Sequence, residues 1–212
     1  MKAKRYILFD NDGVLVETEK WYYTANVEIL KTMGIDLDET RYRDIMIHGR
    51  SAFELAEEAG YDSETVERAR ERRNDLYQHY LRTEDIAIEG AKEVIEALSK
   101  SHKMGIVTSA RREDFELIHR GRGIAAHMQF VLCSGEYPRA KPYPDPYLQG
   151  LARLGGKKEE TLVVEDSERG LRSALSAGID CIVVKNHFTS SHDFSNAAHR
   201  IDALRELLEL LL

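Results

Sequence analysis

The sequence has few cysteines and no surplus of basic residues. Cys133 and Cys181 are the two cysteines in 212 residues, and each stands in a short apolar run. Buried, reduced thiols are therefore favoured over a disulfide or a metal pair, which leads us to expect a cytoplasmic protein. Lys and Arg total 30 against 37 acidic residues, a formal charge of -7, so we expect no nucleic-acid partner, which would need a basic face.

Long apolar runs are also missing. A membrane-spanning helix needs about 20 apolar residues, and no segment approaches that length. The apolar run after the basic start of the chain ends at Asp10, too early for the roughly 7–15-residue core of a secretory signal. We therefore expect no membrane partner. The composition, 42% hydrophobic and 32% charged, excludes disorder, collagen and a coiled coil for the chain as a whole.

Short apolar runs alternate with helical patterns, which predicts an α/β fold with a parallel sheet. Each run is uncharged until its C-terminal end, as expected of strands buried on both faces. The five predicted strands are 6–9, 104–108, 130–133, 162–165 and 181–184. Between them we expect helices, one with Asp145 as N-cap, Pro146 at its first position and Gly155 at its end.

Residues 17–83 contain no convincing strand. Their helical patterns are 24–33, a capping box at 51–54 and a charged helix over 63–81. An insertion of about 65 residues is too long for a simple crossover. The sequence thus predicts a core of residues 1–16 plus 84–212 and an all-helical cap of residues 17–83. Arginines 68, 70, 72 and 73 alternate with acids, which favours a solvated helix face over a ligand site.

Acidic residues follow two of the predicted strands. Asp10 and Asp12 follow the first, and Glu165 and Asp166 end the fourth. Ligands of parallel sheets bind beyond the carboxyl ends of the strands, and neighbouring carboxylates need a cation or protons to persist. An oxygen-only donor set selects a hard cation such as Mg²⁺, whereas an Asp-Gly turn is the structural alternative for the first pair. A cation beside an exposed carboxylate indicates phosphoryl chemistry with Asp as the nucleophile.

Groups suited to bind phosphate follow two other predicted elements. Thr108 and Ser109 end the second strand with hydroxyls and backbone N–H groups, and Lys141 could neutralise a transferring phosphoryl group. Alone, each has an ordinary explanation, because such hydroxyls usually cap helices and a single lysine is usually solvated. Beside the acids they predict a phosphate site.

Together these segments resemble the haloacid dehalogenase-like hydrolase superfamily. Asp10-Asn11-Asp12-Gly13-Val14 is similar to its first motif, Thr108 to its second, Lys141 to its third and Glu165-Asp166 to its fourth. The resemblance runs from residue 6 to about residue 184. It implies a Rossmann-like parallel sheet with helices on both faces, and an all-helical cap inserted between the first two motifs. It also implies a magnesium-dependent phosphatase acting on a small phosphorylated metabolite, such as a sugar phosphate or phosphoglycolate.

The resemblance implies a role for each motif residue. Asp10 would form an aspartyl-phosphate, and Asp12 would act first as acid and then as base. The residues implied to bind phosphate are Asn11, Thr108, Ser109 and Lys141. Those implied to bind Mg²⁺ are Asp10, Asp12 and Asp166, with Glu165 beside them or behind them.

Two other functions stay open at this point. A β-phosphoglucomutase-like mutase shares the motifs and the cap position, but has a histidine on the helix where this chain has Tyr22. A catalytically idle binding module would normally have lost a motif residue, and none is lost here. Dehalogenation is disfavoured because Asp12 is present.

Three cap residues are candidates for substrate binding. His48 and Arg50 precede the capping-box helix, in a region where related caps face the active site. Arg50 could bind a substrate carboxylate or hydroxyl, or lie on the surface. Tyr22 could line the cavity or pack between cap helices. We expect a monomer or a small homo-oligomer.

Overall fold

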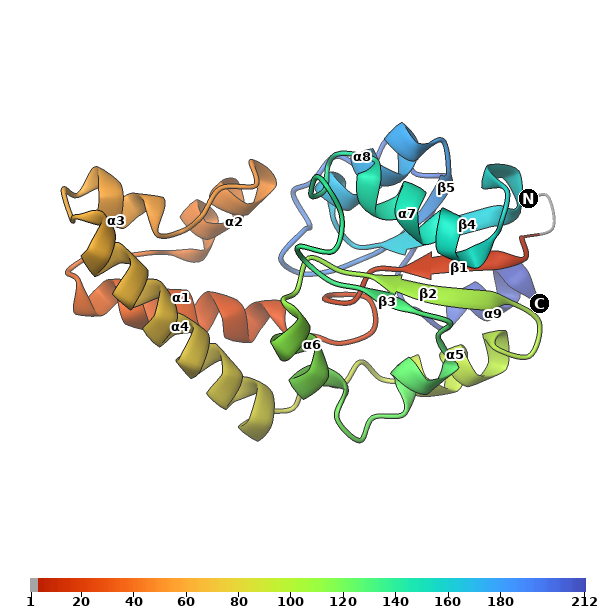
Figure 1. The fold of residues 1–212 in the computed structure, drawn as a ribbon, viewed down its shortest axis with the longest axis horizontal. Coiled ribbons are helices and arrows are strands. Elements are labelled where there is room, and N and C mark those ends of the chain that lie inside the picture. The colour runs from red at the N-terminus through yellow and green to blue at the C-terminus, as the bar shows by residue number, and fades with distance from the viewer. Residues whose placement is uncertain (1–3) are drawn as a thin grey trace. The chain divides into compact units, whose positions relative to one another are not determined.

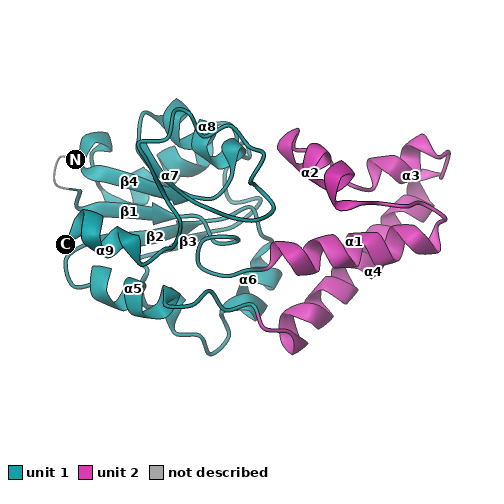
Figure 2. Ribbon diagram, turned by 180° about the vertical axis from the view of Figure 1, so that it is seen from behind, with its two compact units in different colours: residues 1–17, 86–212 teal, residues 18–85 magenta. Residues whose placement is uncertain are grey.

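The computed structural model describes residues 4–212 and divides the chain into two compact units, coloured separately in Figure 2. Unit 1 comprises residues 1–17 and 86–212, and unit 2 comprises residues 18–85. The predicted cap, residues 17–83, differs from unit 2 by one residue at its start and two at its end. Among the described residues, no helix combines the length and apolar character needed to cross a membrane.

Unit 1 is built on a six-stranded sheet in which all neighbouring strands run parallel, in the order β3-β2-β1-β4-β5-β6. Figure 1 shows β1 between β2 and β4. The strands are β1 (Tyr6–Phe9), β2 (Lys103–Val107), β3 (Val131–Leu132), β4 (Thr161–Glu165), β5 (Asp180–Val184) and β6 (His199–Ile201). Phe9 is in register with Ile106 of β2 and Val164 of β4. The segments that follow β1, β2 and β4 therefore start at one edge of the sheet.

Helices cover both faces of this sheet. They are α5 (Ala91–Leu98), α6 (Arg112–His119), α7 (Asp145–Leu154), α8 (Glu168–Ala177) and α9 (Glu206–Leu211), with two 3₁₀ turns at Ile124–His127 and Lys158–Glu160. Successive residues of a strand point to opposite faces. Ile7 and Phe9 accordingly join one apolar cluster, with side chains of α5, α6 and α9, and Leu8 joins another, with side chains of α7 and α8. The predicted α/β fold is thus confirmed.

Unit 2 is all-helical in its described residues. Its helices are α1 (Glu19–Thr32), α2 (Glu39–Ile47), α3 (Glu54–Glu58) and α4 (Ser63–Thr83). Aromatic contacts join α1 to α4, with ring centroids 5.3 Å apart for Trp21 and Tyr80. Asp38 and Asp62 cap α2 and α4 by accepting backbone N–H groups three residues ahead.

Some local expectations were wrong. The N-cap of α7 is Pro144, so Asp145 is its first residue and Pro146 its second. Neither β6 nor α2 was expected. In β6, His199 and Arg200 are exposed, which removes the apolar run by which a buried strand is recognised. Both cysteines are buried and free, as the sequence suggested.

Candidate active site

Three carboxylates meet where β1 and β4 end. Asp10 directly follows β1, Glu165 is the last residue of β4, and Asp166 follows it. Each offers an oxygen within 4.8 Å of the others, and all three residues are buried. The parallel pairing of β1 with β4 explains the cluster, because it brings the carboxyl ends of both strands to the same edge.

Lys141 links two of these carboxylates. Its Nζ lies 2.6 Å from Asp10 Oδ1 and 2.6 Å from Glu165 Oε1, and it donates a third hydrogen bond to the Val107 carbonyl at 3.1 Å. The three donors of the ammonium group are therefore all used. Burial lowers the pKa of Lys141, but the charges of Asp10 and Glu165 outweigh this and raise it. Lys141 is a fixed positive charge beside Asp10.

Glu165 is held on both oxygens. Oε1 also accepts from the Tyr147 hydroxyl at 2.6 Å, and Oε2 accepts from the Ser167 hydroxyl at 3.0 Å and from the N–H groups of Asp166 and Ser167. Burial raises the pKa of Glu165, but Lys141 and these hydrogen bonds outweigh it and lower the pKa. The carboxylate is therefore charged and immobile, which suits an anchor for Lys141.

Sequence reasoning missed Tyr147. Its side chain is fully buried on α7 and contacts a carboxylate of the site. An aromatic residue on the inner face of a helix predicts core packing, and only the hydroxyl partner distinguishes Tyr147 from an ordinary core residue.

Negative charge exceeds positive charge in this cluster. Burial raises the pKa of Asp10 to about 7, and repulsion by Glu165 adds to the rise, while Lys141 acts in the opposite direction. One ammonium group is shared by Asp10 and Glu165, and Asp166 adds a third carboxylate. A hard divalent cation would balance the excess, and the all-oxygen donor set suits one.

The loop after β1 is shaped to accommodate the Asp166 carboxylate. Gly13 has a φ of 76°, and a Cβ at this position would lie 2.0 Å from Asp166 Oδ2. Any side chain here would displace the carboxylate, so glycine is required both for backbone conformation and for space. The residues present therefore fit a cation held between the two strand ends.

Hydroxyl groups connect the end of β2 to the loop after β1. Thr108 Oγ1 donates to Asp12 Oδ2 at 3.3 Å and accepts from the Ala110 N–H at 3.0 Å. Ser109 is exposed, whereas Thr108 is fully buried. The structure thus brings Thr108 to Asp12, and Lys141 to Asp10 and Glu165.

Asn11 lies between the two aspartates and is fully buried. Its Oδ1 is 2.6 Å from Nε2 of His119, the last residue of α6. No sequence signal indicated His119, because a lone histidine at a helix end carries no motif.

The three cap candidates lie in unit 2. Arg50 is exposed and donates to Glu54 at 2.5 Å and Glu58 at 2.9 Å, which fits a surface arginine. His48 is also exposed, with Nδ1 2.8 Å from the Asp44 carbonyl oxygen.

Tyr22 packs edge-on against Tyr77, with ring centroids 5.1 Å apart, and the Arg73 guanidinium lies 4.4 Å from the centre of its ring. Tyr22 therefore takes part in packing α1 against α4. Arg73 is half-buried and donates to Asn26 Oδ1 at 2.9 Å, so the predicted solvated arginine face does not extend to Arg73.

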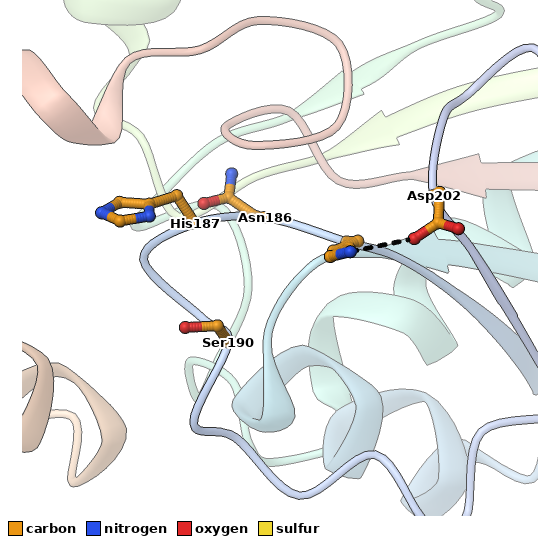
Figure 3. A pocket seen from close by; sticks show the side chains of 5 residues that line it. Asn186, His187, Ser190 and Asp202 are labelled. Atoms are coloured by element: carbon orange, nitrogen blue, oxygen red, sulfur yellow. Dashed lines mark ion pairs between the residues drawn. The ribbon is translucent and has the colours of Figure 1, made fainter.

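A cavity of about 510 Å³ lies beside the loop after β5 (Figure 3). It is lined by Lys185, Asn186, His187, Ser190 and Asp202. Lys185 and Asp202 form an exposed ion pair at 3.3 Å. Asn186 donates to Glu17 at 3.2 Å, and its Nδ2 lies 2.7 Å from where a Cβ on Gly13 would be. Through Asn186 the cavity adjoins the loop after β1.

A family comparison agrees with this geometry. The profile described as Haloacid dehalogenase-like hydrolase matches residues 7–184, which include every predicted motif residue. The chain belongs to this family. The predicted superfamily is thus confirmed, and with it the prediction of a hydrolase.

Individual relatives match most of the length of this chain. The Phosphorylated carbohydrates phosphatase of Thermotoga maritima is 30% identical over 183 residues, covering 83% of this chain and 82% of that protein. Protein SUPPRESSOR OF QUENCHING 1 of Arabidopsis thaliana is 29% identical over 188 residues, covering 84% of this chain but 18% of that protein. A CbbY variant from Rhodobacter sphaeroides, crystallised with xylulose-(1,5)bisphosphate, has a TM-score of 0.82 at 24% identity and covers 96% of both chains. At 24% identity, the similarity to the CbbY structure shows that the two chains share a fold.

Proposed function

We propose that the protein is a magnesium-dependent phosphatase that hydrolyses a small phosphomonoester, of the sugar phosphate or phosphoglycolate type, through an aspartyl-phosphate on Asp10. The observation that carries the proposal is Lys141, whose ammonium lies 2.6 Å from both Asp10 and Glu165. It fixes the nucleophile and places positive charge where phosphoryl oxygens would arrive. The name of the Thermotoga maritima relative and the sugar bisphosphate bound to CbbY support this substrate class.

The reaction uses the two aspartates in turn. An Asp10 oxygen attacks phosphorus, the bond from phosphorus to the substrate oxygen breaks, and Asp12 gives its proton to the departing alcohol. Asp12 then takes a proton from water, which attacks the phosphoryl group, releases phosphate and restores Asp10. The Thr108 hydroxyl donates to Asp12 Oδ2 at 3.3 Å before substrate binds, and it turns this donor to a phosphoryl oxygen when the ester is bound.

The remaining residues hold the phosphoryl group and the cation. Thr108 and the backbone N–H groups near Asn11 and Ser109 bind phosphoryl oxygens, and the Lys141 ammonium, whose three donors are already used, neutralises their charge. Asp10, Asp166 and the Asp12 carbonyl would hold Mg²⁺, with Glu165 behind them as the anchor of Lys141. When bound, the cation neutralises charge between the carboxylate nucleophile and the anionic ester.

We also propose a role for three cap residues and a cellular compartment for the protein. Tyr22, His48 and Arg50 contribute to substrate choice from unit 2. The protein acts in the cytoplasm, which the free, buried state of Cys133 and Cys181 supports.

The proposal is tested by measuring phosphate release from p-nitrophenyl phosphate and a metabolite panel, with and without Mg²⁺. Asp10→Asn should reduce turnover to the uncatalysed background, because an amide cannot form the acyl-phosphate. Asp75→Asn, at an exposed carboxylate of unit 2, is the matched control and should retain full activity.

Each other outcome has a defined meaning. Turnover by Asp10→Asn equal to that of the unchanged protein would refute the mechanism. A requirement for a sugar bisphosphate activator, with little net phosphate release, would identify a phosphosugar mutase instead. No turnover and no binding of Mg²⁺ or phosphate would identify an idle module.

A further inference from the structure

The loop between the two catalytic aspartates is organised around Asn11. The Asn11 carbonyl accepts the N–H groups of Leu15 at 2.8 Å, Val16 at 3.2 Å and Val14 at 3.3 Å. Gly13 N–H donates to the Val16 carbonyl at 2.7 Å and closes the turn. The position of Asn11 therefore sets the path of the backbone that carries Asp10 on one side and Asp12 on the other.

The Asn11 side chain has one partner among the described residues. His119 Nε2 lies 2.6 Å from Asn11 Oδ1, and Asn11 Nδ2 is buried with no partner. Because Oδ1 carries no proton, the histidine is the donor, which assigns its proton to Nε2. A change that removes this donor leaves the carboxamide buried without any hydrogen bond.

His119 is itself fixed in place. It is 9% exposed, and its ring lies against Phe115 with centroids 4.4 Å apart. Burial, together with repulsion from Arg122, lowers the pKa of His119 to about 4, so the ring is neutral near pH 7. A neutral, packed imidazole is a directional donor with little freedom to turn away.

The helix that carries His119 also begins at the active site. The N–H of Ala110, two residues before the first residue of α6, donates to the Thr108 hydroxyl at 3.0 Å, and that hydroxyl donates to Asp12. One end of α6 is thus connected to Asp12 through Thr108, and the other end to Asn11 through His119. The two contacts hold the loop after β1 against the end of β2.

We propose that His119 is a positioning residue of the active site, which holds the loop bearing Asp10 and Asp12 in its reactive geometry through the hydrogen bond to Asn11. The proposal rests on the proposed function for its effect on turnover. Lys141, which the proposed function places beside the phosphoryl oxygens, is held by Glu165 and the Val107 carbonyl independently of Asn11. Loss of the bond should therefore lower kcat and leave KM largely unchanged.

The test compares His119→Phe, which keeps a flat ring and removes the donor, with His119→Gln, whose amide can donate to Asn11. His102→Phe is the matched control, because His102 is also 9% exposed and its ring hydrogen-bonds to Ser101 and Leu98, away from the loop after β1. We expect His119→Phe to lower kcat roughly 5- to 100-fold with KM within about threefold, and His119→Gln to restore most of it. His102→Phe should affect stability alone.

A second readout is independent of catalysis. Hydrogen exchange of the N–H groups of residues 13–16 should be faster in His119→Phe than in His102→Phe and the unchanged protein, because these groups depend on the position of Asn11. Unchanged exchange in His119→Phe would overturn the proposal, even if the protein were not a phosphatase. A kcat loss of equal size in His102→Phe, or no rescue by His119→Gln, would also overturn it.

Discussion

Replacing Gly170 by alanine should destabilise the protein, although the same change on an exposed helix is stabilising. Gly170 lies in the first turn of α8, and a Cβ there would lie 1.8 Å from Glu165 Oε1 and 2.2 Å from Oε2. Glu165 is fully buried. If its carboxylate moves, Oε1 loses its hydrogen bonds from Lys141 and Tyr147, or Oε2 loses its hydrogen bond from Ser167. The alanine methyl group must therefore break part of the charge network.

The size of the effect follows from two opposing contributions. Disrupting a buried ion pair costs about 3–5 kcal/mol, and the higher helix propensity of alanine returns about 1 kcal/mol. The net loss of about 2–4 kcal/mol corresponds to a Tm about 4–16 °C lower for a chain of this length. Activity should fall as well, because Lys141 loses the anchor that holds it beside Asp10.

Scanning calorimetry of Gly170→Ala and Ser176→Ala measures the difference. Ser176 is exposed on the same helix, so its replacement should change stability by less than about 0.5 kcal/mol. A Tm for Gly170→Ala equal to or above that of Ser176→Ala would show that the Glu165 carboxylate is free to move, which would refute the reasoning.

Three further predictions concern Tyr147, the cation site and His119. Tyr147→Phe removes one donor to Glu165 and should cost about 1–3 kcal/mol in thermal unfolding with the fold retained; an unchanged Tm would contradict the 2.6 Å bond. Mg²⁺ at about 100 times its Kd should stabilise the protein by about 2.7 kcal/mol, and this gain should disappear in Asp166→Asn, as thermal shift titration would show. Because burial lowers the pKa of His119 from 6.5 to about 4, the unfolded chain binds a proton that the folded chain does not, so stability falls as pH decreases from about 6.5 to 4. His119→Gln should flatten this part of the pH–stability curve, and an equal slope in both proteins would contradict the assignment.

The sequence allowed the sheet and its acidic edge to be predicted because both depend on local patterns. An uninterrupted apolar run that ends in Asp10, or in Glu165, marks a buried strand and its polar end within a few residues. The parallel arrangement then brings those ends together without further information. By contrast, β6 has two exposed residues of three and gives no such run.

The partners of the site residues could not be predicted, because they depend on packing between distant segments. Tyr147 and Glu165 are 18 positions apart, and His119 and Asn11 are 108 apart. Tyrosine on a helix and histidine at a helix end are common in every core. Only the three-dimensional structure shows that Tyr147 donates to Glu165 and that His119 lies against Asn11.

The two chain segments that border unit 2 are tied to each other inside unit 1. Val16 and Ala87 form an antiparallel bridge, and the Glu17 N–H donates to the Ile86 carbonyl at 3.0 Å. The entry and exit of the 68-residue insertion, 18–85, are therefore neighbours. A short turn or an unrelated module could therefore replace it without a new backbone path in the sheet. The length of the replacement matters little, because the entropic cost of closing a loop grows slowly with its length. The inserted segment is thus an exchangeable part, which can diversify while the chemistry at the strand ends is retained.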